Sequence, residues 1–426
     1  MSSDAGSGAS SQATLARPDL FEKCRNYGRM VGGYFMRPQD AKALGLYTYF
    51  EVFGPREGLP PGEIRWGDRT VLMFGSNDYL DLINHPRVKE AAIEAVRRYG
   101  SGCSGSRLLN GTLDLHVRLE AELAAFVGKQ AAMTFGTGFQ TNYATLSGLT
   151  EKGDVLVCDH NLHASLVEGA LRSGARKVRF RHNDMDHLER CLRACAPDER
   201  ILIVSESVFS MEGDVADLRN TVRLAKQYHA RVFVDEAHGI GVFGPTGAGV
   251  AEQQGVLADV DIVMGTFSKS FASVGGFIAA DQDVIEYLRH TTRGFVFSAA
   301  LPPASVAAVL AALQIIREEP ERRHRLLRTA QRLRSELRAR GFWVYDGETP
   351  IVPVVIPNEL DLFRVVRGLL EEGIYVNPVL KPAASQNLVR ISCTAAHTDE
   401  HVERLVETLG RVTQRLNIDL SARPSA

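Results

Sequence analysis

The stretch IVMGTFSKS (Ile262–Ser270) places a lysine shortly after a run of apolar residues. Such a run is typical of a buried strand, which predicts that Lys269 lies just beyond a strand end, among small and hydroxyl-bearing residues. A lysine amine there can form a Schiff base with an aldehyde cofactor such as pyridoxal phosphate, and the neighbouring Thr266 can contact a phosphate. Taken alone, the pattern equally describes a lysine in a surface loop.

A second apolar run ends in a carboxylate earlier in the chain, in the stretch VFVDEAHG (Val232–Gly239). Asp235 is expected at the C-terminal end of its strand, where α/β sheets bind ligands. An acidic group there can keep a pyridine nitrogen protonated, and His238 can hydrogen-bond the hydroxyl of the same ring. Alone, Asp235 could be a helix N-cap and His238 a packed histidine. Their combination with Lys269 favours a cofactor site.

These motifs resemble those of the α-oxoamine synthases, fold-type-I pyridoxal phosphate enzymes that condense an amino acid with an acyl thioester and release carbon dioxide. The resemblance extends from about residue 37 to residue 416. It implies an α/β fold, with a large, mostly parallel sheet domain and a smaller C-terminal α/β domain. Further matching segments, in chain order, are Gly75–Leu80, Gly105–Arg107, His163–Ser165, Ser207–Asp214, Phe297–Pro303 and Val389–Ser392.

The resemblance assigns a set of residues to the cofactor. The apolar run Ala131–Phe135 ends at a Gly-Thr-Gly turn, and a helix is expected from Gln140. Because a helix N-terminus attracts anions, Gly138 and Phe139 are expected to contact the phosphate, together with the hydroxyl of Thr266. The full set implied is Gly138, Phe139, His163, Ser210, Asp235, His238, Thr266, Lys269 and Ser298.

Roles in catalysis and substrate binding follow from the same resemblance. His163 is expected to stack on the pyridine face, and freed Lys269 is expected to remove the α-proton of the amino acid. Arg390 is expected to bind the substrate carboxylate through its planar fork, with Asn77 in a substrate-contacting loop. The catalytic set is Lys269, His163, Asp235 and His238, and the substrate-binding set is Asn77 and Arg390.

Some of these residues admit other interpretations. Glu206 and Ser210 follow the apolar run Ile201–Ser205 and either line the cleft or cap a loop. His160 and His163 are three residues apart and could suggest a metal site. No third ligand is near in the sequence, however, and a cofactor site explains His163 without a metal. We therefore expect no metal.

Composition limits the class of protein. The chain has 426 residues and a formal net charge of −2, with mixed charges that provide no basic surface for nucleic acid. No apolar run reaches the length of a membrane-spanning helix, and the N-terminus lacks the features of a signal peptide. The six cysteines are scattered, and we expect reduced thiols in a cytoplasmic protein.

Short apolar runs and amphipathic segments alternate over much of the chain, as expected for a parallel sheet. We predict a disordered tail (1–18), an N-terminal arm (19–65), a large cofactor-binding domain (66–303) and a small C-terminal domain (304–418). The predicted strands are Ala131–Phe135, Asp154–Cys158, Lys177–Phe180, Ile201–Ser205, Arg231–Val234, Asp261–Met264, Phe342–Tyr345, Ile351–Ile356 and Val389–Ser392. The predicted helices include Arg219–Tyr228, Ala304–Arg317, Glu321–Arg340, Leu360–Glu371 and Thr398–Leu416.

The resemblance, and not the composition, implies dimerisation. Members of the family are homodimers with the active site at the subunit interface, and Phe297–Pro303 resembles the segment that reaches the neighbour's phosphate. The expected small-molecule partners are an amino acid and an acyl thioester, carried by coenzyme A or by acyl carrier protein. The aromatic patch Tyr47–Phe53 is either a wall of the acyl channel or part of the dimer core.

Within the family, several segments resemble bacterial serine palmitoyltransferases most, which predicts L-serine and a long-chain acyl thioester as substrates. Departures at Asp81 and at Lys381–Ser385, in segments expected to border the site, leave both specificities open. The alternatives are an 8-amino-7-oxononanoate synthase, another α-oxoamine synthase of a secondary pathway, and a non-catalytic partner subunit, which would lack Lys269. The segments that most resemble bacterial serine palmitoyltransferases are Met36–Tyr47, Gly105–Thr112, His182–Met185 and Gly265–Phe277.

Overall fold

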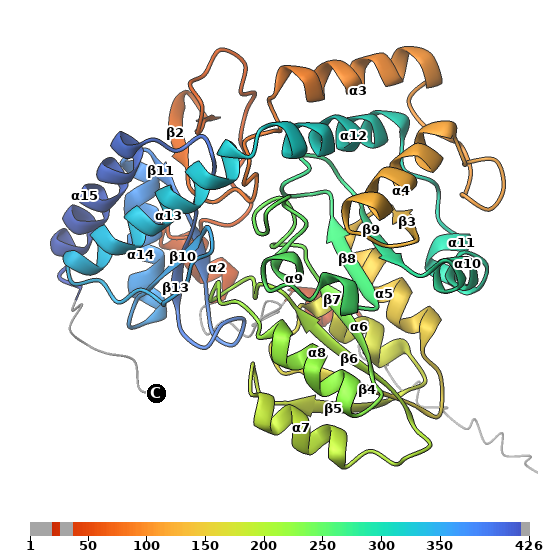
Figure 1. The fold of residues 1–426 in the computed structure, drawn as a ribbon. Coiled ribbons are helices and arrows are strands. Elements are labelled where there is room, and N and C mark those ends of the chain that lie inside the picture. The colour runs from red at the N-terminus through yellow and green to blue at the C-terminus, as the bar shows by residue number, and fades with distance from the viewer. Residues whose placement is uncertain (1–18, 26–36, 419–426) are drawn as a thin grey trace, which may run out of the picture.

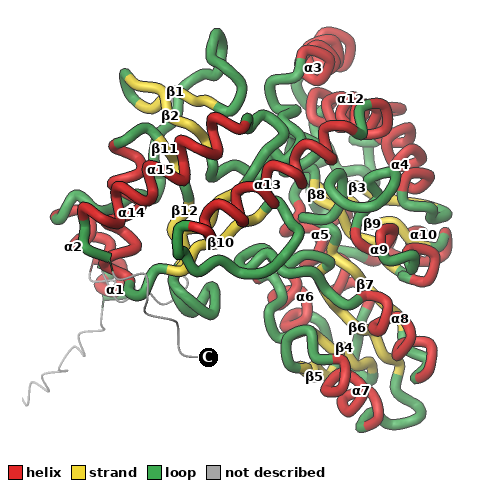
Figure 2. Tube along the Cα trace, turned by 60° about the vertical axis from the view of Figure 1, so that its left-hand side comes forward, coloured by secondary structure: helices red, strands yellow, loops and turns green. Residues whose placement is uncertain are grey.

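The computed structural model describes residues 19–25 and 37–418 (Figure 1). The predicted tail (1–18) and residues 26–36 of the predicted arm lie outside the described residues. The larger body is a sheet with helices on both faces, and a smaller unit containing the C-terminal helices lies beside it (Figures 1 and 2).

Seven strands form the central sheet of the larger body. They are β3 (Ala131–Phe135), β4 (Asp154–Asp159), β5 (Arg176–Phe180), β6 (Arg200–Glu206), β7 (Arg231–Asp235), β8 (Ile262–Thr266) and β9 (Gly276–Ala280). The strand order is β3-β9-β8-β7-β6-β4-β5, and β9 alone in this sheet runs antiparallel to its neighbours. The mostly parallel sheet is confirmed, and it places several strand C-termini at one edge.

Helices cover both faces of this sheet. They are α3 (Pro86–Tyr99), α4 (Asp114–Phe126), α5 (Gly138–Leu149), α6 (Ala164–Arg172), α7 (Met185–Arg193), α8 (Leu218–Gln227), α10 (Gln282–Thr291), α11 (Arg293–Val296) and α12 (Pro303–Glu318), with the short α9 (Val250–Gln253) nearby. Leu202 and Val204 of β6 pack in one apolar core with α5, α6, α10 and α11. Ile203 points to the opposite core, shared with α3, α4, α7, α8 and α12, because successive strand side chains alternate.

The smaller unit combines two short sheets with long helices (Figure 2). Its helices are α13 (Glu321–Ala339), α14 (Glu359–Glu371) and α15 (Asp399–Arg415). One sheet is antiparallel, with order β10 (Ile351–Val355), β13 (Leu388–Ser392), β12 (Asn377–Val379). The other pairs β1 (Glu63–Trp66) and β2 (Arg69–Met73) with β11 (Ile374–Tyr375). The N-terminal part of the chain therefore folds against the C-terminal unit, preceded by the short α1 (Glu22–Arg25) and α2 (Pro38–Ala43).

Some predicted elements are wrong in detail. Phe342–Tyr345 forms no strand, because only Val344 makes an isolated bridge, to Val354. The helix expected from Gln140 begins at Gly138, since Thr137 caps it by accepting a hydrogen bond from the Gln140 N–H at 3.0 Å. Strand β9 is an addition to the predicted set.

The predicted domain boundary near residue 304 falls just inside α12. That helix packs on α3 and α4 of the larger body, whereas α13 packs on α15 of the smaller unit. The boundary stays a prediction, and this packing favours a position after α12. In the described ranges, no helix is long and apolar enough to cross a membrane.

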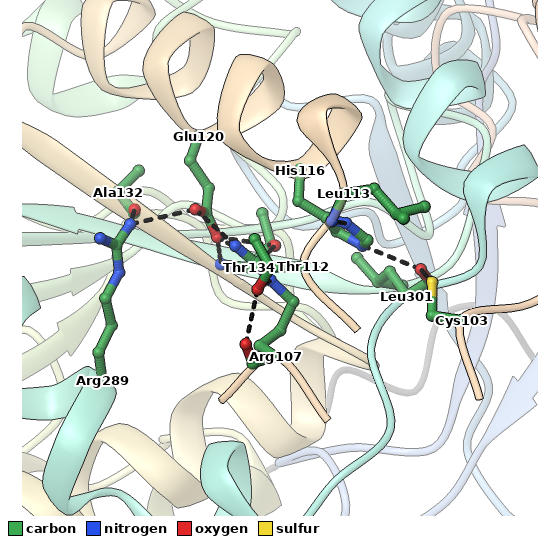
Figure 3. A network of polar contacts seen from close by, with 10 residues as sticks. All are labelled: Cys103, Arg107, Thr112, Leu113, His116, Glu120, Ala132, Thr134, Arg289 and Leu301. Atoms are coloured by element: carbon green, nitrogen blue, oxygen red, sulfur yellow. Dashed lines mark hydrogen bonds and ion pairs between the residues drawn. The ribbon is translucent and has the colours of Figure 1, made fainter. Parts of the chain in front are cut away.

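A buried carboxylate on α4 links the preceding loop to β3 and α10 (Figure 3). Glu120 accepts two hydrogen bonds from the Arg107 guanidinium, at 2.7 and 3.0 Å, and one from Arg289 at 3.1 Å. The main-chain N–H of Thr134 donates to the same carboxylate at 3.0 Å. Because the Glu120 side chain is only 5% exposed, its charge depends on these partners, and together they fix the strand that leads to the Gly-Thr-Gly turn.

Glu120→Ala is expected to lower the free energy of unfolding by about 3 kcal/mol or more, because it leaves the buried guanidinium of Arg107 without its counter-charge. Chemical denaturation measures the loss. Glu122→Ala is the matched control on the same helix, since Glu122 pairs with Arg317 at the surface and such pairs contribute about 1 kcal/mol at most. Equal losses in the two variants would contradict this prediction.

Candidate active site

Strand ends and helix starts enclose a cavity of about 390 Å³. It lies at the C-terminal ends of β6, β7 and β8, the edge at which α/β sheets bind ligands. Ser210 and Ser298 are the predicted cofactor residues that do not line it. Those that do are Gly138, Phe139, His163, Asp235, His238, Thr266 and Lys269.

The amine and the carboxylate at the centre come from neighbouring strands. Lys269 follows β8, and Asp235 ends β7. Asp235 is 4% exposed and accepts hydrogen bonds from the Ala237 N–H at 2.8 Å and from Asn142 Nδ2 at 2.7 Å. Burial lowers the pKa of Lys269 to about 8, against the opposing charges of Asp235 and Glu206. A substantial fraction of the amine is therefore neutral and nucleophilic near pH 8.

The start of α5 forms one end of the cavity. Its first N–H groups and the helix dipole suit an anion. A side chain at Gly138 would meet Thr266 Oγ1, because its Cβ would lie 2.6 Å from that oxygen. Glycine therefore lets the helix start approach the Thr266 hydroxyl, which also lies 3.0 Å from Ser268 Oγ. Helix start and hydroxyls converge as a phosphate site requires.

His163 caps α6 at the cavity wall. Its Nδ1 accepts a hydrogen bond from the Ser165 N–H at 3.3 Å and lies 2.7 Å from Ser165 Oγ, while its main-chain N–H donates to Glu206. Solvent reaches the ring, yet the surrounding protein lowers the pKa of His163, with Lys269 adding to the shift and Asp235 opposing it. The imidazole is therefore neutral near pH 7.

His238 is buried and pairs with a tyrosine that the sequence analysis did not assign. Tyr79 Oη lies 2.6 Å from His238 Nδ1. Burial and the charges of Lys269 and Arg390 lower the pKa of His238 well below its usual value, and burial raises the pKa of Tyr79 to about 12. The Tyr79 hydroxyl thus stays protonated and can donate a hydrogen bond to His238 Nδ1. The proton of neutral His238 then belongs on Nε2.

Arg390 lies next to this pair, 6% exposed, on β13 of the smaller unit. Its Nε donates to the Ser210 main-chain oxygen at 2.6 Å, and its Nη1 donates to Ser392 Oγ at 2.8 Å and to Asn77 Oδ1 at 3.3 Å. Among the described residues, no Asp or Glu forms an ion pair with Arg390. A buried guanidinium held only by neutral groups suits an anionic ligand.

Burial of an arginine without a carboxylate partner does not by itself indicate a ligand-binding role. Arg323 and Arg334 are equally buried, and both donate to main-chain carbonyls. Arg390 differs because it lies close enough to His238 and Tyr79 to lower the pKa of each. Its position near the cavity residues therefore favours a role in binding.

Glu206 ends β6 directly beside Asp235, its register partner on β7. Burial, reinforced by the charge of Asp235, raises the pKa of Glu206 well above its usual value. It lines the cavity and holds the His163 main chain, so the cleft-lining interpretation agrees with the structure. Ser210 instead contributes its main-chain oxygen to Arg390, outside the cavity wall.

Ser298 lies outside the cavity of its own chain. Its hydroxyl accepts from Gln140 Nε2 at 2.8 Å and donates to the Gly294 main-chain oxygen at 2.7 Å. Its predicted role at a neighbour's phosphate stays a prediction.

The departures from the family pattern, at Asp81 and at residues 381–385, do not line the cavity either. Asp81 has φ of 55°, a conformation that favours glycine, and lies in a separate small pocket.

A charged histidine ties together the loops that flank the site. His182 contacts Asp159 through Nδ1 and Asp214 through Nε2, both at 2.9 Å. Burial alone would lower the pKa of His182, but the two carboxylates raise it to about 10, so the ring is protonated. The loop that carries His163 and the loop that carries Ser210 are thereby joined through one imidazolium.

The cysteines and histidines of the described ranges form neither a disulfide nor a group of metal ligands. All six cysteines lie in the described ranges and are free thiols. Within those ranges, no three His, Cys, Asp or Glu side chains are grouped as a metal ion requires.

The site residues that the sequence analysis missed are Tyr79, Asn142 and Ser165. Tyr79 and Ser165 lie in segments already recognised as family-like, but a buried tyrosine and a serine in the first turn of a helix are common in cores and caps. Asn142 lies on α5, four residues after the Gly-Thr-Gly turn, and is only 2% exposed. A polar side chain on an inward helix face is the signal that could have indicated it.

Comparison with known proteins identifies the family. Residues 69–409 match the model of the family described as aminotransferase class I and II. The chain is 46% identical over 383 residues to a serine palmitoyltransferase of Bacteroides thetaiotaomicron, covering 89% of this chain and 96% of the relative. It is 45% identical over 409 residues to a putative 8-amino-7-oxononanoate synthase 2 of Mycobacterium tuberculosis, covering 95% of this chain and 51% of the relative.

A solved structure agrees with these sequence relatives. A serine palmitoyltransferase variant of S. paucimobilis with bound PLP and myriocin superimposes with a TM-score of 0.86 at 34% identity, covering 89% of this chain and 96% of that chain. The chain therefore belongs to the aminotransferase class I and II family, in the group of α-oxoamine synthases that includes serine palmitoyltransferases and 8-amino-7-oxononanoate synthases.

Proposed function

We propose that the protein catalyses the pyridoxal phosphate-dependent condensation of L-serine with a long-chain acyl thioester. The products are a 3-oxo amine of the 3-ketosphinganine type, carbon dioxide and a free thiol. The observation that carries the proposal is the pairing of Lys269, which follows β8, with Asp235 at the end of β7 in one cavity. Arg390 on β13 is outside the cavity lining but close enough for its charge to lower the pKa of Lys269. The 46% identity to a serine palmitoyltransferase supports L-serine as the amino acid.

The cavity suits pyridoxal phosphate in its chemistry. The start of α5 and the Thr266 hydroxyl suit the phosphate, and Gly138 keeps free the space that a Cβ would fill. Asp235 suits a protonated pyridine nitrogen, and Lys269 suits an aldehyde. When bound, the cofactor supplies an aldehyde that reacts with amines and a ring that takes up electrons from the substrate Cα.

Each site residue then has a separate role in the proposed reaction. Arg390 binds and orients the substrate carboxylate through charged hydrogen bonds. Lys269, with its pKa lowered to about 8, accepts the proton from Cα and later returns one to the same carbon. Asp235 holds the proton on the pyridine nitrogen. His163 and His238, both neutral, serve as hydrogen-bond donors to oxygen atoms.

We also propose a cytoplasmic homodimer with the site at the interface. Exposed apolar side chains either line the cavity, as Phe139 and Val274 do, or lie on the two loops that the Ser106–Ala299 bridge joins. Clusters of this kind mark protein interfaces, and a second copy of the chain is the partner that the family resemblance implies. These exposed side chains are Leu108, Leu109, Phe139, Val274 and Phe297.

With L-serine, turnover is expected to rise with acyl length from butyryl- to stearoyl-coenzyme A. Each methylene buried in an apolar channel contributes about 0.8 kcal/mol, so four more carbons are expected to raise kcat/KM by about two orders of magnitude. Release of free thiol measures turnover, with glycine and alanine as competing amino acids. Equal rates for all chain lengths would contradict a long-chain channel.

A second candidate function has its own support, in the 45% identity to a putative 8-amino-7-oxononanoate synthase. Faster turnover of alanine with pimeloyl thioester in the same assay would assign that reaction. Turnover with acyl carrier protein thioesters but not with coenzyme A esters would assign the donor and point to a secondary pathway.

Capture of pyridoxal phosphate by cofactor-free protein is expected to accelerate with rising pH, with a midpoint near the Lys269 pKa of about 8. The neutral amine is the nucleophile, so protonation below that pKa slows attack. Stopped-flow absorbance follows the reaction, and an exposed lysine would show its midpoint near pH 10.4 instead, about its ordinary pKa. A midpoint in that higher range would contradict the lowered pKa.

A further inference from the structure

We propose that Asn142 and Ser165 are positioning residues that fix the tautomer of His163 through a hydrogen-bond chain that starts at Asp235. The inference deepens the proposed function and rests on it, because the tautomer decides which ring nitrogen can serve the substrate. The chain is Asp235, Asn142, Ser165, His163, in that order, and one hydrogen bond joins each successive pair of side chains.

The first link orients the amide of Asn142. Its Nδ2 donates to Asp235 Oδ2 at 2.7 Å. A carboxylate can only accept hydrogen bonds, and a flipped amide would place Oδ1 against a negative charge. In the described part of the chain, Asn142 Oδ1 is buried and without a partner. The orientation is thus kept even though an acceptor stays unsatisfied, because both amide hydrogens are used.

The second link orients the hydroxyl of Ser165. Asn142 Nδ2 also donates to Ser165 Oγ at 2.9 Å, and Ser165 is only 1% exposed. Since this oxygen already accepts from the amide, its own hydrogen is free to donate elsewhere. His163 Nδ1 lies 2.7 Å away. The Ser165 hydroxyl therefore donates to His163.

The third link determines which nitrogen of the His163 ring carries the proton. His163 Nδ1 also accepts from the Ser165 main-chain N–H at 3.3 Å, as the N-cap of α6. Two donors converge on this nitrogen, so it carries no proton, and the neutral ring must carry its proton on Nε2. His163 lines the cavity and thus presents a donor to it.

A fixed Nε2–H has a chemical consequence for the proposed reaction. An imidazole N–H can stabilise an anionic oxygen, such as a substrate carboxylate or the oxyanion that develops at a thioester carbonyl. With the other tautomer the same nitrogen would be an acceptor and would repel that oxygen. Asp235 therefore acts at two places: directly at the pyridine nitrogen, and through Asn142 and Ser165 at His163.

Nitrogen NMR of the full-length protein, labelled at histidine and measured with and without pyridoxal phosphate, tests the proposal. The His163 signals are assigned by their loss in His163→Gln. Wild-type protein is expected to show a protonated Nε2 and an unprotonated Nδ1. In Ser165→Ala and Asn142→Leu the two tautomers are expected to mix, and kcat/KM is expected to fall by about tenfold or more.

Two further variants separate tautomer control from a structural role. Ser165→Thr keeps the hydroxyl and is expected to restore the wild-type signals. Thr145→Val is the matched control on α5, since Thr145 is buried and its hydroxyl has no partner among the described residues. It is expected to leave the signals unchanged. A proton on Nδ1 in wild-type protein, or unchanged signals in Ser165→Ala, would overturn the proposal.

The tautomer measurement without cofactor needs neither substrate nor turnover. An enzyme that shows the expected signals but does not condense L-serine with acyl thioesters would refute the proposed function and leave the hydrogen-bond chain standing. An enzyme with the expected turnover but a proton on His163 Nδ1 would refute the hydrogen-bond chain alone.

Discussion

Replacing Lys269 with alanine is expected to lower kcat/KM by at least about 10⁴-fold, because one side chain carries both the capture of the cofactor and the transfer of the Cα proton. Lys269 is the lysine that lines the cavity, beside Asp235. Thiol release from a long-chain acyl-coenzyme A in the presence of L-serine measures the loss. Mass spectrometry after borohydride reduction measures covalent attachment of the cofactor, which is expected to vanish in the variant.

Lys226→Ala is the matched control, since Lys226 is an exposed lysine that pairs with Asp259 at the surface. It is expected to retain both activity and covalent cofactor. Thermal unfolding of the alanine variant at position 269 distinguishes loss of chemistry from loss of fold. A folded Lys269→Ala protein that keeps more than about a hundredth of wild-type activity would contradict the assignment of Lys269 as the proton-transfer group.

The parts of the fold that were predicted share a clear physical signal. Strands such as β4 and β6 are short apolar runs buried on both faces, and α13 and α15 are long helices with one apolar face. The strand β9 also has an apolar run, but it follows the loop of Lys269 closely. Its antiparallel placement between β3 and β8 depends on long-range pairing, which local patterns do not encode.

The site was predicted where a residue type and its motif suffice, and missed where only contacts reveal the role. Lys269 and Asp235 lie at strand ends within recognisable motifs. Tyr79 becomes functional only because the fold brings it within 2.6 Å of His238, far away in sequence. Asn142 likewise acquires its role from Asp235, through a single hydrogen bond between α5 and β7. Tertiary contacts of this kind have no local signature.

Arg390→Ala is expected to raise the dissociation constant of the amino acid by between about 10² and 10⁴-fold. A bidentate contact provides two charged hydrogen bonds, each worth roughly 1.5–3 kcal/mol. Arg390 is buried and held by Ser210, Ser392 and Asn77, so its fork is already oriented before substrate binds. Titration of the bound cofactor's visible spectrum with L-serine measures the constant, and cofactor affinity is expected to change little.

Arg390→Lys separates charge from geometry at the same position. Lysine keeps the positive charge but lacks the planar fork, so an affinity between those of wild type and Arg390→Ala is expected. Arg325→Ala is the matched control, because Arg325 donates to the Ala395 main-chain oxygen on the outside of the same unit. An unchanged dissociation constant in Arg390→Ala would place the substrate carboxylate elsewhere. Since the pKa of His238 is lowered partly by Arg390, the alanine variant should also make that histidine easier to protonate.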